Sequence, residues 1–256
     1  MNVIKVLKDL YLDKEGLNIH VSIFALLGIM TLSLNNVLLS YTGNVYSNYL
    51  GFAPTNKFEL VLDLFFGLLL FLFFVGYLGQ VVQDSFSAGT KGLPKVSLSA
   101  FSLFVRTLPI IIVWSVYLLF MVLLGAVIVP YPSSLFYIYY SLLICFIPFI
   151  HIILVMFTEK CEIKPEYFSP ALLLKVMDNT LGAVILLSVQ ILILALLLYG
   201  VIYAVFHFAN DFRSPYIQLS FRMAGLCLSV YFINIVTYIY VKCLVNIVQN
   251  KINVDV

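Results

Sequence analysis

Long uninterrupted apolar runs constrain this chain more than any other feature of its sequence. A helix needs about 20 apolar residues to cross the hydrocarbon core of a bilayer. Only helices and closed barrels satisfy their backbone hydrogen bonds inside lipid. Because these runs are continuous and do not alternate with polar residues, they predict helices. We therefore expect an all-α integral membrane protein with six spans, at about 20–40, 58–80, 107–129, 135–157, 180–206 and 218–246.

The composition agrees with a membrane location. Of the 256 residues, 63% are hydrophobic and 10% are charged, whereas a soluble domain is nearer half apolar and a quarter charged. The net charge of +2 is too small to indicate a nucleic-acid partner. The N-terminal stretch MNVIKVLKDLYLDKEG is too polar for a secretory signal, so we expect no cleavable leader.

Lysine and arginine are distributed unevenly between the two sets of loops. Eleven of the 14 lie in one set, which includes both termini, and three lie in the other, at Lys57, Arg213 and Arg222. Cytoplasmic loops carry the excess of positive charge. We therefore predict a multi-pass protein of the cell's inner (plasma) membrane, with both termini in the cytoplasm.

Three amphipathic segments precede outward spans, and each is too short and too polar to cross. They are 2–12, 97–106 and 167–179, and their pattern is typical of interfacial helices. In the first, the predicted apolar face is Val3, Ile4, Leu7, Leu10 and Tyr11. We therefore predict one transmembrane domain over 1–256 that consists of three repeated units. Each unit has an interfacial helix and two spans, and the units are 1–84, 85–160 and 161–256.

The joint after the second span carries a family resemblance. The stretch GYLGQVVQDSFSAGTKGLPK places Gly76 and Tyr77 at the end of a span and Leu93 and Pro94 before an amphipathic segment. IPFIHIILVMF and PALLLKVMDNTLGAVILL follow later in the chain. This order resembles an uncharacterised family of prokaryotic multi-span membrane proteins known as domain of unknown function 4013. The resemblance implies a bacterial or archaeal membrane protein and supplies no catalytic residues.

Ionisable residues inside spans are candidate functional residues because they are costly there. Asp63 and Arg222 lie near the outer ends of two spans. They either reach water separately or pair with each other. His151 follows Pro148 in the fourth span. A kink beside a histidine suits a gate or a proton site, and it also suits packing in which His151 bonds to a neighbour.

Neutral polar residues lie deep in other spans. Gln190 and Asn234 are predicted to form hydrogen bonds between helices, and Asn36 suits that role or a polar cavity. If three parallel units enclose a central cavity, Asn36, Asp63, His151, Gln190 and Asn234 are its predicted lining.

The sequence lacks the catalytic and metal-binding motifs that would support an enzyme. The sequence has no H-E-x-x-H and no G-x-S-x-G, so no catalytic, cofactor or metal residues are proposed from it. The favoured hypothesis is a non-enzymatic membrane subunit or scaffold of a transport or export system. A stand-alone transporter or channel for a small or apolar solute is the alternative. Predicted partners are the bilayer, anionic lipid at the cytoplasmic face, and a soluble or membrane subunit.

Overall fold

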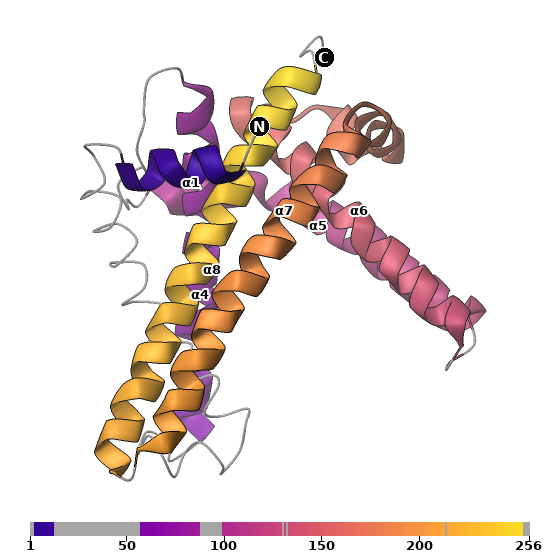
Figure 1. The fold of residues 1–256 in the computed structure, drawn as a ribbon. Helices are drawn as coiled ribbons and strands as arrows, with labels where there is room; N and C mark the ends of the chain where they lie inside the picture. Colours follow the sequence, from indigo (N-terminus) through magenta and orange to yellow (C-terminus); the bar gives the residue numbers. More distant parts are fainter. Residues whose placement is uncertain are drawn as a thin grey trace.

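The computed structural model describes residues 3–12, 57–87, 99–129, 131, 133–212 and 214–252, and for parts of α4, α7 and α8 only the backbone. The predicted first span, 20–40, lies outside these residues. Every element within them is helical (Figure 1). The helices are α1 (Val3–Leu12), α4 (Lys57–Phe86), α5 (Ser99–Ile128), α6 (Ser134–Lys160), the short 3-10 helix η1 (Pro165–Phe168), α7 (Pro170–Asp211) and α8 (Pro215–Lys251).

Four of the described helices are long and apolar enough to cross a membrane. The qualifying stretches are Ser99–Ile128, Ser134–Lys160, Pro170–Phe208 and Tyr231–Lys251, which correspond to the third to sixth predicted spans. The second predicted span coincides with α4, for much of which only the backbone is described. The all-helical membrane class predicted from the sequence is therefore present, whereas the six-span count and the repeat stay predictions.

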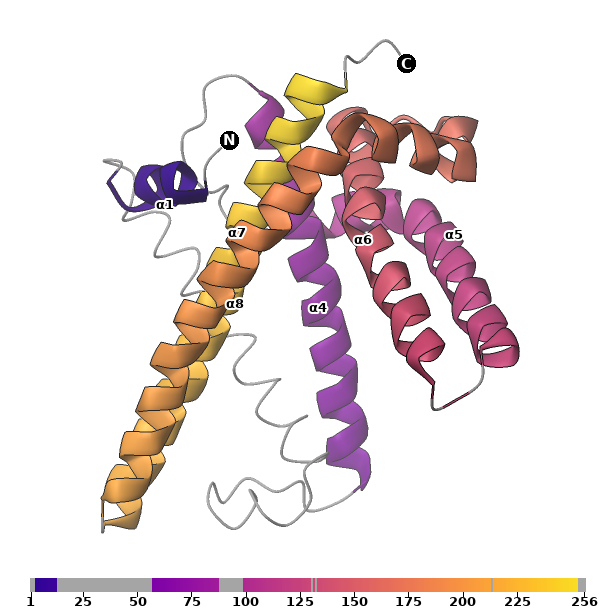
Figure 2. The same ribbon diagram turned by 45° about the vertical axis from the view of Figure 1, so that its right-hand side comes forward.

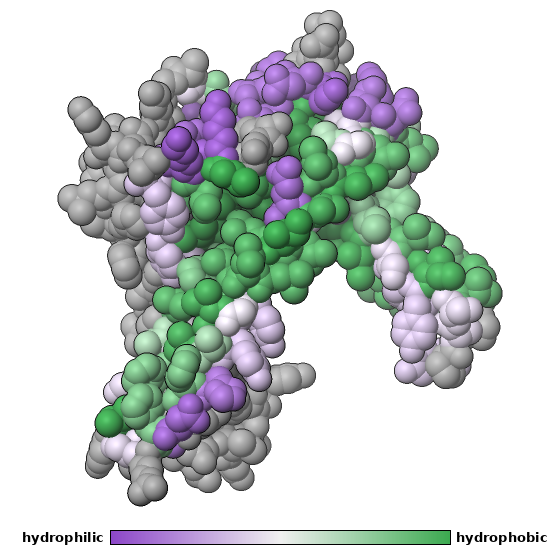
Figure 3. Space-filling model, in the orientation of Figure 1, coloured by the Kyte–Doolittle hydropathy of each residue, from purple (hydrophilic) through white to green (hydrophobic). Residues whose placement is uncertain are grey.

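The helices pack at one end of the molecule and diverge toward the other. Helices α5 and α6 form one hairpin, and α7 and α8 form a second, longer one (Figure 2). The two hairpins separate as they leave the packed end, which the space-filling view shows as two apolar limbs (Figure 3). Many of the buried side chains, among them Ile152, Ile153, Ile239 and Val248, lie in the halves of α6 and α8 that meet at this end.

Helices α5 and α7 each begin with a stretch that runs across the packed end before the rest of the helix turns down (Figure 2). The 42 residues of α7 would extend about 63 Å at 1.5 Å per residue, roughly twice the hydrocarbon thickness. The predicted interfacial segments 97–106 and 167–179 thus do not form separate helices. Apart from η1, they are continuous with the spans that follow them.

Helix α1 also runs across the packed end, against α7 and α8 (Figure 1). Its buried face is Val3, Val6 and Leu10, with Leu7 partly buried. The predicted face is therefore wrong at Ile4 and Tyr11, which are 69% and 42% exposed, and it lacks Val6. Residues 3, 6, 7 and 10 are neighbours on one side of a helix, so the contact with α7 and α8 selects one of two adjoining apolar strips.

Close approach of α4 and α5 depends on Gly76. A Cβ added there would lie 2.6 Å from the carbonyl carbon of Ala100 and 3.2 Å from Cβ of Phe104. Small residues let backbones approach in this way where lipid supplies no hydrophobic driving force. The first turn of α5 is thereby fixed across α4, and this contact helps to form the packed end.

Candidate intramembrane cavity

A cavity of about 550 Å³ lies where five helices converge near the packed end. This volume is within the range of roughly 300–1,000 Å³ that is usual for small-molecule sites. Most of its walls are aliphatic, and no lysine, arginine, aspartate or glutamate is among the described residues that line it. The lining residues come from α4 (Val75, Leu78, Gly79, Val82), α5 (Thr107, Ile111), α6 (His151, Leu154, Val155, Thr158), α7 (Ile191) and α8 (Val236, Thr237, Tyr240, Val241, Leu244).

His151 and Tyr240 form the polar centre of this cavity. The Nδ1 atom of His151 lies 2.9 Å from the hydroxyl of Tyr240, and the two rings meet edge to face with centroids 5.7 Å apart. The bond joins α6 to α8 across 89 positions of sequence. It agrees with the packing hypothesis for His151, and it also places the ring against the cavity.

The three threonines of the lining are engaged with their own helices. Thr107 donates to the carbonyl of Phe104 at 2.8 Å, Thr158 to that of Leu154 at 2.6 Å, and Thr237 to that of Ile233 at 2.7 Å. Back-bonding of this kind satisfies the hydroxyl hydrogen without a partner helix. The threonines therefore add little hydrogen-bond donor capacity to the cavity.

The other candidate polar residues lie elsewhere or outside the described part of the chain. Gln190 is at the contact of α7 with α1, where its side-chain oxygen accepts from the backbone N–H of Val3 at 3.2 Å. Asn234 is buried within α8, and neither residue lines the cavity. Asn36 and the side chains of Asp63 and Arg222 lie outside the described residues. The predicted Asp63–Arg222 pair therefore lies outside them too.

A second, smaller pocket lies among α6, α7 and α8 near the ends of α6 and α8. Its volume is about 240 Å³, and Lys175 of α7 and Lys251 of α8 both line it, with Asn179 beside them. Its apolar lining is Met156, Leu172, Val176 and Ile252. Two cations and an apolar lining in one pocket suit an anionic lipid, with its headgroup at the lysines and its hydrocarbon against the apolar side chains. Figure 3 shows hydrophilic residues gathered over this end of the molecule.

The segment between α6 and α7 is tied to α5 by a buried hydrogen bond. The indole N–H of Trp114 donates to the backbone carbonyl of Tyr167 at 3.0 Å. The Tyr167 ring meets Phe157 edge to face, with centroids 5.8 Å apart. Burial, and then the carboxylates of Glu159, Glu162 and Glu166, raise the pKa of the Tyr167 phenol above its ordinary value. The phenol is therefore held in its neutral form.

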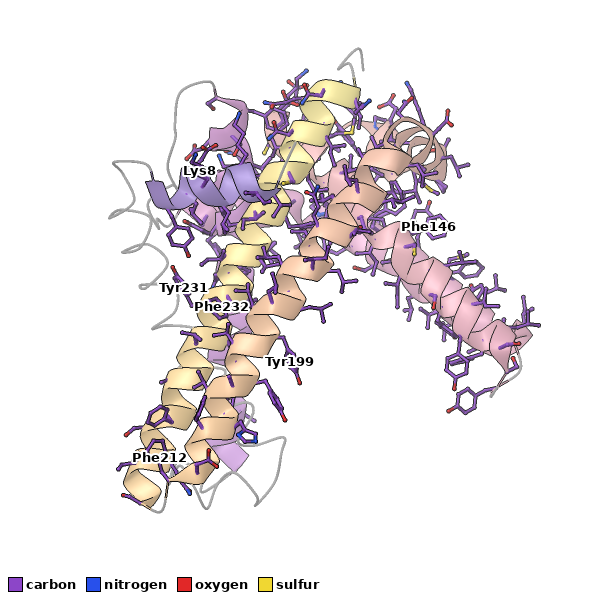
Figure 4. The ribbon with its side chains drawn as sticks, viewed as in Figure 1. Lys8, Phe146, Tyr199, Phe212, Tyr231 and Phe232 are labelled. Carbon is purple, nitrogen blue, oxygen red and sulfur yellow. The ribbon has the colours of Figure 1, made fainter. Side chains whose placement is uncertain are left out.

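Aromatic side chains mark the exposed flanks of the two hairpins and the side of α1. Tyr199 projects outward from α7, and Phe146 from α6 (Figure 4). Phe212 stacks on Phe221 at the tip of the α7/α8 hairpin, with centroids 4.9 Å apart. The Tyr11 hydroxyl of α1 lies 2.8 Å from that of Tyr231 on α8. These aromatics support anchoring and helix contacts and do not line the cavity.

Sequence reasoning identified His151 but missed its partner Tyr240 and the pair Lys175 and Lys251. Thr237, Tyr240 and Leu244 recur at helical spacing in YFINIVTYIYVKCL, which is a signal for one mixed face. The sequence places both lysines on the predicted cytoplasmic side, but their spacing does not indicate that they line one pocket. Within the described residues, no group of three or more His, Cys, Asp or Glu side chains is placed to hold a metal ion.

Comparison with known proteins found no relative of this chain. No family model, curated protein or solved structure matches this chain. The resemblance to domain of unknown function 4013 therefore stays a prediction.

Proposed function

We propose that this chain is a non-enzymatic polytopic membrane protein that serves as the membrane subunit or scaffold of a transport or export system. The observation that carries this proposal is the uneven burial of its helices. In their most apolar stretches only 17% of α5 and 11% of α7 is buried, against 50% of α6 and 56% of α8. Diverging hairpins with such bare apolar faces suit contact with further membrane helices.

The packed end supports a role in docking. The exposed lysines Lys5 and Lys8 of α1 lie there with Lys175 and Lys251 (Figure 4 labels Lys8). Basic residues beside a membrane favour anionic lipid and soluble partners. We propose that the protein lies in the inner (plasma) membrane and that its packed end faces the cytoplasm, as the distribution of lysine and arginine predicts.

Six spans in three parallel units remain our proposal for the architecture. Helix α1 lies at the packed end, whereas α4 begins at the opposite end and rises toward it (Figure 2). Leu12 and Lys57 therefore lie at opposite ends of the described part of the molecule, which supports the proposal of a further span between them. Each proposed unit has one segment that runs across the packed end. These segments are α1, the first stretch of α5 and the first stretch of α7.

The family assignment is also a proposal. Its support is that Gly76 and Tyr77, the first half of the motif, are both buried and that Gly76 lies at the α4–α5 contact. Leu93 and Pro94 lie outside the described residues.

Photo-cross-linking in the native cell tests the subunit proposal. A photo-reactive residue is placed at Leu119 of α5 or Leu197 of α7, which are 57% and 66% exposed. We expect cross-links to one defined protein from these faces, and the same protein after gentle detergent extraction. Labelling of lipid alone at both positions, with a chain that purifies by itself, contradicts the subunit proposal.

The anionic-lipid partner has a separate test. We expect Lys175→Gln with Lys251→Gln to reduce the phosphatidylglycerol that stays bound in native mass spectrometry, because both cations line the same pocket. The double change Lys5→Gln with Lys8→Gln removes the same charge from α1 and is the matched control. Equal loss in both double variants would show a diffuse charge effect in place of a site.

A stand-alone carrier or channel for a small or apolar solute is the second candidate function, and the five-helix cavity favours it. For this candidate we expect the purified chain to carry solute across liposome membranes. We expect this flux to be lost in Leu154→Trp, because the larger side chain fills the cavity. Flux that needs a second protein supports the subunit proposal.

A further inference from the structure

We infer that the five-helix cavity binds one neutral single-chain amphiphile, whose hydroxyl or un-ionised carboxyl group bonds to the His151–Tyr240 pair. The inference goes beyond the proposed function and does not rest on it, because it concerns this chain alone. It applies whether the chain works in an assembly or by itself.

The size and the walls of the cavity indicate an apolar occupant. Apolar cavities of only ~150 Å³ stay dry and accept small apolar molecules, and this cavity measures about 550 Å³. Left empty, its aliphatic walls would forfeit dispersion contacts on one side. The described part of the cavity wall is partly open, so a ligand has a way in.

The His151–Tyr240 bond leaves the same two functions available in either tautomer. If the Tyr240 hydroxyl donates to Nδ1, the Nε2–H of His151 is a free donor and the tyrosine oxygen accepts. If Nδ1–H donates to the tyrosine oxygen, the hydroxyl hydrogen is the free donor and Nε2 accepts. No further partner of His151 or Tyr240 is present among the described residues. The pair thus offers one donor and one acceptor.

A hydroxyl group and an un-ionised carboxyl group each present one donor and at least one acceptor, so they complement this pair. A hydrocarbon leaves both functions unpaired. An ionised headgroup finds no opposite charge on the described part of the lining, which holds no lysine, arginine, aspartate or glutamate. A polar pair in an apolar pocket fixes the orientation of a ligand, and here it selects a chain with one terminal oxygen function.

The test uses a 12-carbon alcohol that carries a diazirine in its chain, added to the purified protein in phosphatidylcholine nanodiscs. After irradiation, peptides are mapped by mass spectrometry. We expect labels on the cavity segments of α6 and α8. Unlabelled 1-dodecanol should compete about tenfold better than dodecane at the same mole fraction in the bilayer, because only the alcohol bonds to the pair.

Two variants separate the pair from the pocket. Tyr240→Phe removes the hydroxyl and keeps the ring, and we expect it to abolish the difference between dodecanol and dodecane. Tyr203→Phe, on the exposed flank of α7, is the matched control and should leave that difference intact. Leu154→Trp fills the cavity and should remove the labels.

The comparison of alcohol and alkane on the unmodified chain needs no variant, so it decides the matter even if Tyr240→Phe fails to fold. Equal competition by dodecanol and dodecane would show a pocket filled by any hydrocarbon and would overturn the inference. Labels that persist in Leu154→Trp would place the alcohol on the outer surface and would overturn it too. Neither outcome bears on whether a partner subunit co-purifies, which tests the proposed function.

Discussion

Replacing Gly76 with alanine tests the contact that joins α4 to α5. The new Cβ would overlap the Ala100 carbonyl group, lying 2.6 Å from its carbon, where carbon atoms pack best at about 3.5–4.0 Å. The two helices would therefore have to separate by about 1 Å. Tyr77, Val81 and Phe104 are buried in this region, and a gap of that size forfeits a quarter to a half of each contact.

The expected cost is the usual penalty of overpacking, about 1–3 kcal/mol. Two matched controls share the chemistry of the change. A Cβ at Gly182 of α7 meets nothing within 4 Å, and one at Gly79 first meets the flexible Leu103 side chain at 3.3 Å. Alanine in a helix is otherwise favoured over glycine by roughly 0.5–1 kcal/mol. We expect the order of stability Gly182→Ala, then Gly79→Ala, then Gly76→Ala.

Thermal unfolding in detergent, followed by the fluorescence of the single tryptophan, measures the difference. At about 2–4 °C per kcal/mol for a chain of this size, a cost of about 1–3 kcal/mol should place the midpoint of Gly76→Ala about 2–12 °C below that of Gly182→Ala at one scan rate. Equal midpoints for the two variants would refute the close approach of α4 and α5 at Gly76.

Four further predictions concern single groups. Trp114→Phe leaves the buried Tyr167 carbonyl without its donor and should cost about 1–3 kcal/mol, measured by circular dichroism. Tyr77→Phe should be neutral or stabilise by up to about 1 kcal/mol, because the buried Tyr77 hydroxyl has no hydrogen-bond partner among the described residues; a loss of stability would reveal a partner. Cys161→Gly should raise the unfolding midpoint relative to Cys161→Ala, because Cys161 has a φ of 52° at the end of α6 and glycine adopts that conformation without strain. The raised pKa of Tyr167 means that folding favours the protonated phenol, so its contribution to stability is complete below about pH 10 and falls as the pH rises further; Tyr167→Phe should weaken that fall.

The existence of the helices followed from the sequence, but their limits did not. The predicted span 107–129 ends close to the end of α5, yet the helix begins at Ser99 because the amphipathic residues before the span continue it. The apolar run predicted the span, since hydropathy reports transfer into lipid. It gave no sign that the preceding turns would share the same helix and change direction.

The candidate site divides in the same way. His151 was identifiable because an ionisable residue inside an apolar run is costly. Its partner Tyr240 is one of many tyrosines, and its role depends on α6 and α8 meeting. Gln190 was expected to bond between helices and does so, but the partner is a backbone N–H of α1 that no side-chain pattern predicts.

The sequence by itself therefore determined the class of the protein and the approximate places of the apolar helices. Hydrocarbon is a uniform solvent, so a local run of apolar residues is enough to decide what enters it. Only the tertiary structure decided which faces meet, where the cavity lies and that His151 bonds to Tyr240. Within lipid, apolar faces gain nothing from leaving water, so helix association depends on close approach and on hydrogen bonds between distant residues. Gly76 against Ala100 and Trp114 against Tyr167 are contacts of that kind, and hydropathy does not encode them.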